Sequence, residues 1–301
     1  DNIYAFEVNG DFDVCQALAK RLLGDRAFAH QVFKDSDRLT SANSISLGRL
    51  LPQAVYPFFA YSRIAGYDEP MIASVPSGNF GDMMGTVLAR EMGLPIPKIL
   101  CGVNENREVP EFLNSGSYVV KPSIKSPSSA MIVSNPSNFA RLIDLYGGHV
   151  YDERDDQGKV MQEGVVDSLP DIDAMRRDLF SIGVSNPDHY KAIQEVHERF
   201  DIIIEPHGSV GWRVLDTFLS GNHDRLAVIY ETADPGKFPD DIRDAIGVVP
   251  DVPEGIAQQA GKQERIYSID EPSDVSKDGS LTLSDAQYEK AKKIMKEIFS
   301  N

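Results

Sequence analysis

The stretch from residue 71 to residue 103 constrains the fold more than any other part of the sequence. A short apolar run at 71–75 leads into a polar turn at 76–81, a helical pattern at 82–92 and a second apolar run at 99–103. Apolar runs of this length are typical of buried strands, and their alternation with helical stretches is typical of layered α/β proteins. The sequence therefore predicts an α/β fold.

The same alternation predicts elements on both sides of this unit. We expect Ser137 to cap one helix, and Ser284 with Gln287 to form a capping box that opens a final helix ending at Phe299. The chain is read as a loop at 206–211 and as an irregular connection at 250–283. The other expected elements are strands at 3–8 and 226–231 and helices at 13–23, 138–146, 188–200 and 212–219.

Residues 45–62 follow helical spacing with apolar side chains on nearly every side. A helix that is apolar all round is typical of a protein interior, so we expect this one to be buried. Pro52 and Pro57 interrupt the pattern, and a proline inside a helix removes a backbone donor and bends the axis. The sequence thus predicts a bent, buried helix.

Composition excludes some classes of function. The 30 Lys and Arg residues against 46 Asp and Glu give a net charge of −16, which argues against a protein that binds nucleic acid by neutralising phosphates. No apolar run reaches the roughly 18 residues of a membrane span, so no membrane partner is expected. The chain opens on Asp-Asn-Ile-Tyr, which is neither a start methionine nor a signal peptide, so we expect a cytoplasmic protein and a longer parent chain.

The turn at 77–81 is the strongest candidate for a binding site. Ser77, Gly78, Asn79, Phe80 and Gly81 lie between an expected strand and an expected helix. Glycines allow a positive φ and turn successive N–H groups toward one concave face, and the helix N-terminus adds a positive dipole. Such a turn suits a phosphate ester, whereas the simpler interpretation is that the glycines only reverse the chain.

Other chemistry-bearing residues give weaker signals. Two cysteines, Cys15 and Cys101, make no disulfide framework, and the six histidines show no metal-ligand spacing, so no metal is expected. His207 is interpreted as a surface loop residue rather than a group that supports a site. The acidic residues at 152–156 are interpreted as a solvated loop, and Trp212 with Met83 and Met84 as core.

Several segments together resemble one enzyme family. The string at 75–82, VPSGNFGD, resembles the phosphate-binding loop of threonine synthases, members of the tryptophan-synthase-β (fold type II) group, which use pyridoxal phosphate. Five further segments are similar and fall in the family's order, so that the likeness covers roughly residues 1–245: 10–16, 41–53, 104–106, 134–139 and 232–238.

The resemblance implies a three-layer αβα fold in which residues 1–40 are part of a small lobe, 41–250 a large cofactor-binding lobe and 251–301 a peripheral tail with one helix. It implies that Ser77 to Gly81 hold the cofactor phosphate and that the hydroxyl of Thr232 meets the pyridine nitrogen. Asn43 and Ser44 are expected to bind a substrate or cofactor oxygen, with simple helix capping as an equal alternative.

In this family O-phosphohomoserine and water give threonine and phosphate, a carbon–oxygen lyase reaction. The resemblance places the Schiff-base lysine upstream of the segment at 10–16, so no catalytic residue is expected in this chain and the segment alone is expected to be inactive. Lys34 lies in a similar Phe-Lys-Asp string, but it falls in a variable stretch and is not the expected base.

Two alternatives stay open at this point. Asp234, Gly236 and Ile132 stand where the family usually has histidine, alanine and an acid. These departures bear on substrate selection more than on cofactor binding, so a related fold-type-II lyase acting on another hydroxy or phospho amino acid is the first alternative. A non-catalytic paralogue is the second alternative. The sequence gives no prediction of the oligomeric state.

Overall fold

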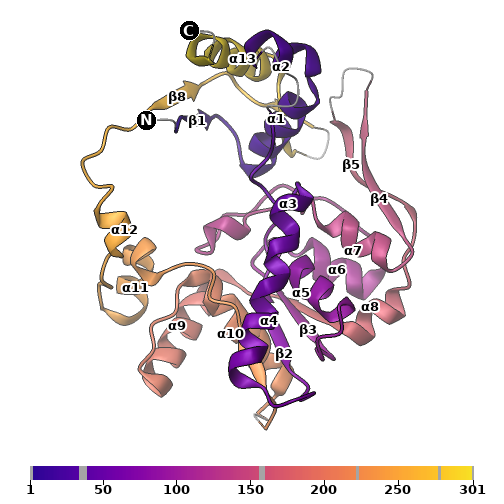
Figure 1. The fold of residues 1–301 in the computed structure, drawn as a ribbon, viewed down its shortest axis with the longest axis vertical. Coiled ribbons are helices and arrows are strands. Elements are labelled where there is room, and N and C mark those ends of the chain that lie inside the picture. The colour runs from indigo at the N-terminus through magenta and orange to yellow at the C-terminus, as the bar shows by residue number, and fades with distance from the viewer. Residues whose placement is uncertain (1–2, 34–38, 156–159, 222–223, 277–278, 300–301) are drawn as a thin grey trace.

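The computed structural model of the chain describes residues 3–33, 39–155, 160–221, 224–276 and 279–299. It confirms the α/β fold (Figure 1). The central sheet has the order β6–β3–β2–β7, and its neighbouring strands are parallel. Its strands are β2 (Ile72–Pro76), β3 (Ile99–Val103), β6 (Leu179–Gly183) and β7 (Ala227–Ile229).

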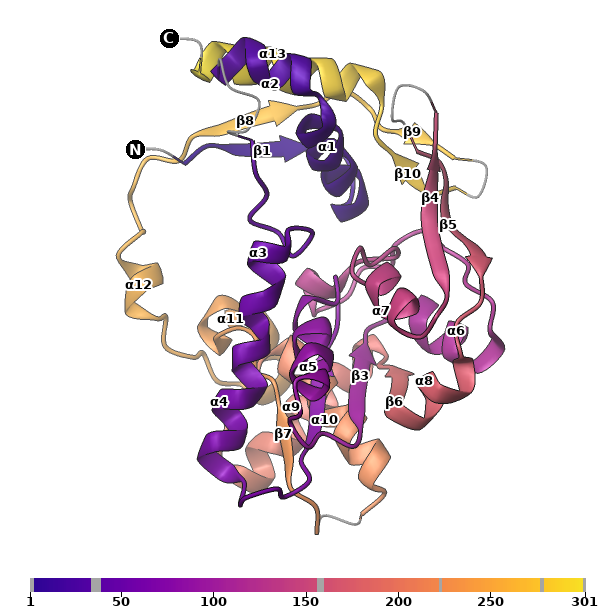
Figure 2. The same ribbon diagram turned by 45° about the vertical axis from the view of Figure 1, so that its right-hand side comes forward.

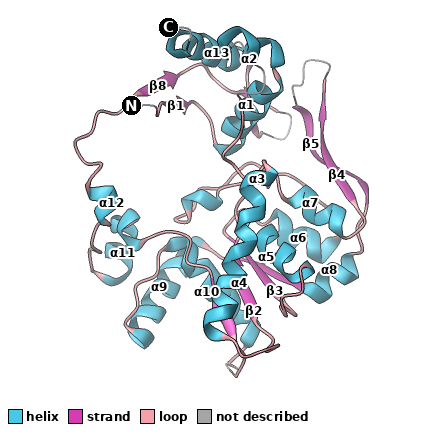
Figure 3. Cartoon of the chain, in the orientation of Figure 1, coloured by secondary structure: helices cyan, strands magenta, loops and turns pink. Residues whose placement is uncertain are grey.

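Helices cover both faces of this sheet, as Figure 3 shows. Because strand side chains alternate in direction, Ala73 and Cys101 pack in one core while Ile72 and Leu100 pack in the other. The first core also takes in α5 (Gly81–Glu91), α6 (Glu108–Ser115) and α7 (Phe139–Leu145). The second contains Val210 and Val214 of α10 (Pro206–Leu219), against which α9 (Asn186–Phe200) packs. The three-layer αβα architecture is thereby confirmed.

The expected long helix at 45–62 is three helical segments, α3 (Leu47–Leu50), the 3₁₀ turn η2 (Leu51–Ala54) and α4 (Val55–Ile64). The change of helix type occurs at Leu51, directly before Pro52, whose missing N–H favours an interruption of the helix there. The expectation of complete burial is wrong. Leu50 and Ala54 are buried in the core, whereas Leu51 and Val55 are exposed.

The two ends of the chain pack together in a second unit, at the top of Figure 1. β1 (Ala5–Val8) pairs in parallel with β8 (Ile266–Ile269), so part of the stretch expected to be irregular is a strand. The core of this unit includes Val14, Ile269 and Tyr288. Its helices are α1 (Phe12–Gly24), α2 (Arg26–Phe33) and α13 (Asp285–Phe299). The domain boundaries at 40 and 250 stay a prediction.

The capping box before α13 is confirmed. The Ser284 N–H donates to Gln287 Oε1 at 3.1 Å, and the Gln287 N–H donates to Ser284 Oγ at 3.2 Å. The expected Ser137 cap is wrong, because α7 follows Asn138 and its N-terminus has no side-chain cap. The helix expected at 212–219 begins six residues earlier, at Pro206, because the Glu205 side chain caps it by accepting from the N–H groups of His207 and Gly208.

Figure 2 shows the remaining elements of the two units and of the segments that connect them. β4 (His149–Arg154) and β5 (Val160–Ser168) form an antiparallel hairpin that rises toward β9 (Asp274–Val275) and β10 (Leu281–Thr282). Within the described ranges no helix has the length and apolar character needed to cross a membrane. The others are η3 (Ser129–Met131), α8 (Ile172–Asp178), η4 (Pro235–Lys237), α11 (Pro239–Ile246) and α12 (Glu254–Ala257).

Candidate functional site

The turn between β2 and α5 does not use its glycines for a positive φ, contrary to the sequence-based expectation. The left-handed residue is Phe80, with φ 62° and ψ 23°. Its ring is buried and meets Phe139 edge to face at 5.9 Å between ring centroids. A bulky residue in this conformation costs free energy and persists only where the surroundings enforce it, often at functional sites.

The flanking glycines are needed for close packing instead. A Cβ on Gly78 would lie 2.7 Å from the carbonyl oxygen of Ala130 and 2.9 Å from the Cα of Met131. A Cβ on Gly81 would lie 2.8 Å from Oε1 of Gln53. The turn is therefore packed closely between η3 and η2, and this close packing fixes its backbone.

The backbone donors of the turn divide into two groups. The Ser77 N–H donates to the Gly102 carbonyl at 2.7 Å, and its hydroxyl donates to the Val75 carbonyl at 2.9 Å, so both are used in the fold. The N–H groups of residues 78–81 donate to no acceptor among the residues that the structure describes. The N-terminus of α5 has no side-chain cap either. Unpaired N–H groups at a helix start are an anion-binding arrangement.

The side chain of Asn79 holds three segments together. Its Nδ2 donates to Asn43 Oδ1 at 3.1 Å and to Ser44 Oγ at 3.4 Å. Its Oδ1 accepts from the N–H and the hydroxyl of Ser137, at 2.7 and 2.9 Å. The amide is therefore occupied by the protein itself, and the backbone of the turn is what faces a ligand.

Asn43 and Ser44 do lie beside the turn, as expected of a shared site. Asn138 donates to Ser44 Oγ at 2.7 Å and to the Asn79 carbonyl at 2.8 Å. Arg141 donates to the carbonyls of Ser44 and Ile45 at 3.0 and 2.6 Å. These supporting roles of Asn138 and Arg141 were not predicted from the sequence.

Thr232 lies at the same edge of the sheet as the turn. β7 pairs directly with β2, with Ile229 opposite Ser74, so the segments that follow the two strands leave from adjacent carboxyl ends. Thr232 is exposed there. In open parallel sheets this edge is where ligands bind. The nearby Asp234 is engaged in a local turn, since its Oδ1 accepts from the Gly236 N–H at 2.8 Å.

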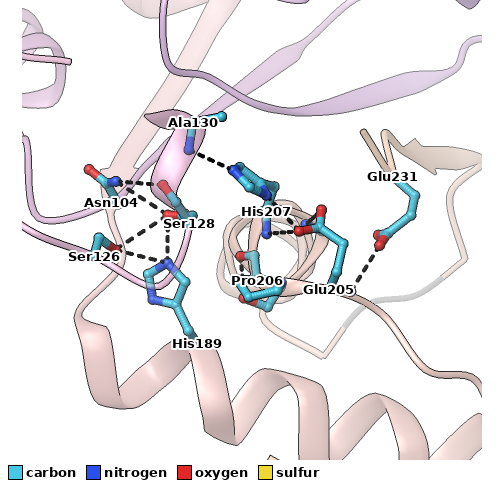
Figure 4. A network of polar contacts seen from close by, with 11 residues as sticks. Asn104, Ser126, Ser128, Ala130, His189, Glu205, Pro206, His207 and Glu231 are labelled. Atoms are coloured by element: carbon cyan, nitrogen blue, oxygen red, sulfur yellow. Dashed lines mark hydrogen bonds and ion pairs between the residues drawn. The ribbon is translucent and has the colours of Figure 1, made fainter. Parts of the chain in front are cut away.

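His207 is buried in the first turn of α10, so its interpretation as a surface loop residue is wrong. Figure 4 shows it between two partners. Its Nε2 accepts from the Ala130 N–H at 3.1 Å, which leaves Nδ1 to donate to Glu205 Oε2 at 2.5 Å. Ala130 is also the residue on which Gly78 packs. His207 thus supports the wall of the anion-binding turn.

A second carboxylate, Glu231, lies against the same helix start. Its Oε1 accepts from the Glu205 N–H at 2.9 Å, and a Cβ on Gly208 would overlap its Oε2. Desolvation, opposed in part by the Glu205 N–H and reinforced by the Glu205 carboxylate, raises the pKa of Glu231 to about 8. Sequence reasoning missed this residue, because the pairing depends on the contact between β7 and α10.

A buried histidine lies on the other side of the network in Figure 4. Nδ1 of His189 donates to the Ser185 carbonyl at 2.8 Å, and Nε2 is 3.0 Å from Ser128 Oγ. Burial lowers the pKa of His189, which favours the neutral ring. Asn104, at the end of β3, donates to the same hydroxyl at 3.2 Å. These groups fix the 126–131 segment beside the turn.

The remaining sequence-based interpretations have different outcomes. Lys34 lies outside the described residues. No group of three or more His, Cys, Asp or Glu side chains able to hold a metal occurs in the described part of the chain. Met83 and Met84 are buried in the core, whereas Trp212 is only half-buried.

The chain is similar to known threonine synthases over most of its length. It is 35% identical over 265 residues to threonine synthase of Corynebacterium glutamicum, which is 85% of this chain and 54% of that relative. For the Escherichia coli enzyme the values are 32% over 260 residues, 86% and 54%. The chain thus spans about half the length of these curated relatives. No family model matches it.

The fold is similar to solved structures of the same name. The Escherichia coli threonine synthase crystal structure matches with a TM-score of 0.75 at 27% identity, covering 99% of this chain and 59% of that one. The pyridoxal-phosphate-bound threonine synthase from Brucella melitensis matches with a TM-score of 0.74 at 26% identity, covering 100% and 60%.

Proposed function

Because this chain is homologous to about half of threonine synthase, a fold-type-II enzyme, we propose that it is the part of such an enzyme that binds pyridoxal phosphate. The observation that carries the proposal is the pairing of two features at one sheet edge: unpaired N–H groups at 78–81 and the exposed hydroxyl of Thr232 on the adjacent strand end. A phosphate and a pyridine nitrogen at opposite ends of one ring fit these two donor types.

The residues present fit the cofactor. The turn offers main-chain donors at a helix N-terminus and no side-chain cap that would compete. Each charge-assisted hydrogen bond contributes roughly 1.5–3 kcal/mol. Four such bonds supply most of the roughly 8 kcal/mol that micromolar binding requires. Asn79 and Asn138 hold the turn in place without occupying it.

Pyridoxal phosphate, when bound, supplies an electron sink for carbanion chemistry on an amino acid. In this proposal the N–H groups of 78–81 hold its phosphate and orient the ring. Thr232 offers the ring nitrogen a neutral hydroxyl, which does not hold a proton on the pyridine. Asn43 and Ser44, fixed against Asn79, lie where a substrate oxygen would bind.

The proposed reaction is conversion of O-phosphohomoserine and water to threonine and phosphate. We propose that this chain binds and orients but does not by itself catalyse, since the base is expected in a part of the relatives that the chain does not match. We also propose that the parent enzyme is a cytoplasmic biosynthetic enzyme without a nucleic-acid partner.

Binding of pyridoxal phosphate, followed by its absorbance and by quenching of Trp212 fluorescence, tests the proposal. Thr232→Val should weaken binding about tenfold, because it removes the hydroxyl but keeps the shape and the exposed position. Thr217→Val on α10 is the matched control and should bind as the unaltered chain does. Equal binding by both variants would show that the Thr232 hydroxyl does not contact the cofactor.

A separate experiment distinguishes threonine synthase from a related fold-type-II lyase with another substrate. O-phosphohomoserine, O-phosphoserine and serine should be compared for binding to the chain loaded with pyridoxal phosphate, by the change that each produces in the absorbance of the bound cofactor, with phosphate release measured alongside. Preference for O-phosphohomoserine supports the proposed reaction, and preference for another amino acid supports the related lyase. Release of phosphate by the chain alone would contradict the expected absence of a catalytic base.

A further inference from the structure

The start of α10 contacts segments at both ends of the candidate site. At one end, His207 Nε2 accepts from the Ala130 N–H at 3.1 Å, and Ala130 is the residue on which Gly78 of the turn packs. At the other end, the His207 ring meets the ring of Phe238 edge to face, at 5.3 Å between ring centroids. Phe238 closes the short segment that begins at Thr232. One buried side chain therefore connects the turn with the Thr232 segment.

The segment from Thr232 to Phe238 is folded locally, so that a contact at its end constrains its start. The Lys237 N–H donates to the Asp234 carbonyl at 3.0 Å, and the Phe238 N–H donates to the Pro235 carbonyl at 2.9 Å. Local hydrogen bonds of this kind hold a short connection in one conformation. The contact between Phe238 and the histidine ring therefore bears on the position of the Thr232 hydroxyl.

Glu205 makes a second connection between His207 and the same segment. Its Oε2 accepts from the N–H and from Nδ1 of His207, at 2.9 and 2.5 Å, so the ring is fixed in one orientation. The Glu205 N–H donates to Oε1 of Glu231, the residue before Thr232, at 2.9 Å. Figure 4 shows these contacts as one chain that runs from Ala130 through His207 and Glu205 to Glu231.

We propose that His207 is a positioning residue, which holds the turn at 78–81 and the Thr232 hydroxyl at the separation that the two ends of pyridoxal phosphate require. A ligand held at two ends gains affinity over either half only when both subsites stand at the matching separation. His207 acts on the first subsite through Ala130 and on the second through Phe238. This inference rests on the proposed function, which assigns the two subsites.

His189 provides a comparison within the same network. It is buried like His207, and its Nε2 is 3.0 Å from Oγ of Ser128, two residues before Ala130. Its Nδ1 donates to the Ser185 carbonyl, at the start of its own helix. His189 thus supports the wall of the turn, whereas His207 connects that wall with the other end of the site.

The test compares the dissociation constants of three ligands, with pyridoxal phosphate and pyridoxal followed by absorbance and inorganic phosphate by equilibrium dialysis. His207→Asn keeps a donor near the position of Nδ1 but removes the acceptor for the Ala130 N–H. It should weaken pyridoxal phosphate about tenfold and leave pyridoxal and inorganic phosphate, each held at one end, within about twofold. His207→Gln places an amide oxygen near the position of Nε2, so it should restore most of the affinity for pyridoxal phosphate.

His189→Asn is the matched control, because it removes one buried ring nitrogen from the same wall. It should weaken inorganic phosphate and pyridoxal phosphate by the same factor, since it affects one end of the site. Thermal unfolding followed by circular dichroism gives a temperature at which every variant is folded. If His207→Asn does not fold, Phe238→Leu replaces it, and this variant should weaken pyridoxal phosphate but not inorganic phosphate.

Three results would overturn the inference. The first is unchanged binding of pyridoxal phosphate by His207→Asn or, in its place, by Phe238→Leu. The second is a loss of affinity for inorganic phosphate as large as the loss for pyridoxal phosphate, which would confine the effect to the turn. The third is a failure of His207→Gln to bind more tightly than His207→Asn. If the unaltered chain does not bind pyridoxal phosphate, the proposed function fails and this inference with it, whereas the three results above contradict this inference alone.

Discussion

Replacing Asn79 by alanine should destabilise the protein and disorder the candidate site together. The amide makes five hydrogen bonds: two to Asn43 and Ser44, two from Ser137 and one from Gln16. At about 0.5–1.5 kcal/mol for each bond, and with the bonds to Ser44 and from Gln16 longer and weaker than the rest, their loss should lower the free energy of unfolding by about 3 kcal/mol. The Ser137 N–H would also lose its acceptor.

Urea denaturation followed by circular dichroism measures this loss. Asn9→Ala is a matched control, because Asn9 Nδ2 makes one exposed hydrogen bond, to the Asp270 carbonyl at 3.3 Å. It should cost less than about 1 kcal/mol. Asn79→Asp keeps the acceptor for Ser137 but places a carboxylate oxygen against Asn43 Oδ1, so it should be nearly as damaging as alanine.

Two outcomes would contradict the supporting role of Asn79. If Asn79→Ala is as stable as Asn9→Ala but no longer binds pyridoxal phosphate, Asn79 is a ligand of the cofactor and not a support of the turn. If both stability and binding are unchanged, the three segments are held by other contacts.

Three further changes test the surroundings of the site and the second unit. Gly78→Ala should cost about 1–3 kcal/mol in urea unfolding, because its Cβ meets backbone atoms that cannot move aside; a neutral result would show that the turn is loosely packed. Glu231 has a pKa raised from 4.5 to about 8, so its proton contributes stability that is complete below about pH 4.5 and lost as pH rises through 8. The stability of Glu231→Gln should therefore fall less over that range, and parallel profiles would contradict this. Ser284→Ala should cost about 1 kcal/mol through loss of the capping box, and an unchanged midpoint of unfolding would show that the cap is dispensable.

Sequence reasoning succeeded where the signal was local. The strand at 99–103 and the helix and turn before it were found because apolar runs, glycines and prolines lie next to one another there. The capping box at 284–287 was found for the same reason. The candidate site followed from this unit, since the turn is itself a local feature.

The failures came from contacts between distant residues. β8 was missed because its partner β1 lies 261 positions away and because it is a short strand within a stretch rich in Pro, Gly, Gln, Ser and Asp. Gly208 and Gly211 indicated a loop, but both lie within α10. A side chain at either position would clash, because Glu231 packs directly against Gly208 and Ile229 against Gly211. The burial of His207 depends on that same packing.

The positive φ at Phe80 could not be predicted from the sequence either. Gly78 and Gly81 flank this residue, and glycine adopts a positive φ most readily, so the positive φ was expected at the glycines. The structure reverses this assignment, because Gly78 and Gly81 are pressed against Ala130 and Gln53 and the turn closes at the residue between them. Close approach of backbone segments, rather than φ, explains these glycines.

A crystal structure with pyridoxal phosphate bound would locate both ends of the cofactor in one measurement. We expect phosphate oxygens within about 3 Å of the backbone nitrogens of 78–81, and the pyridine nitrogen within hydrogen-bonding distance of the Thr232 hydroxyl. A phosphate bound elsewhere, or a ring whose nitrogen points away from Thr232, would contradict it.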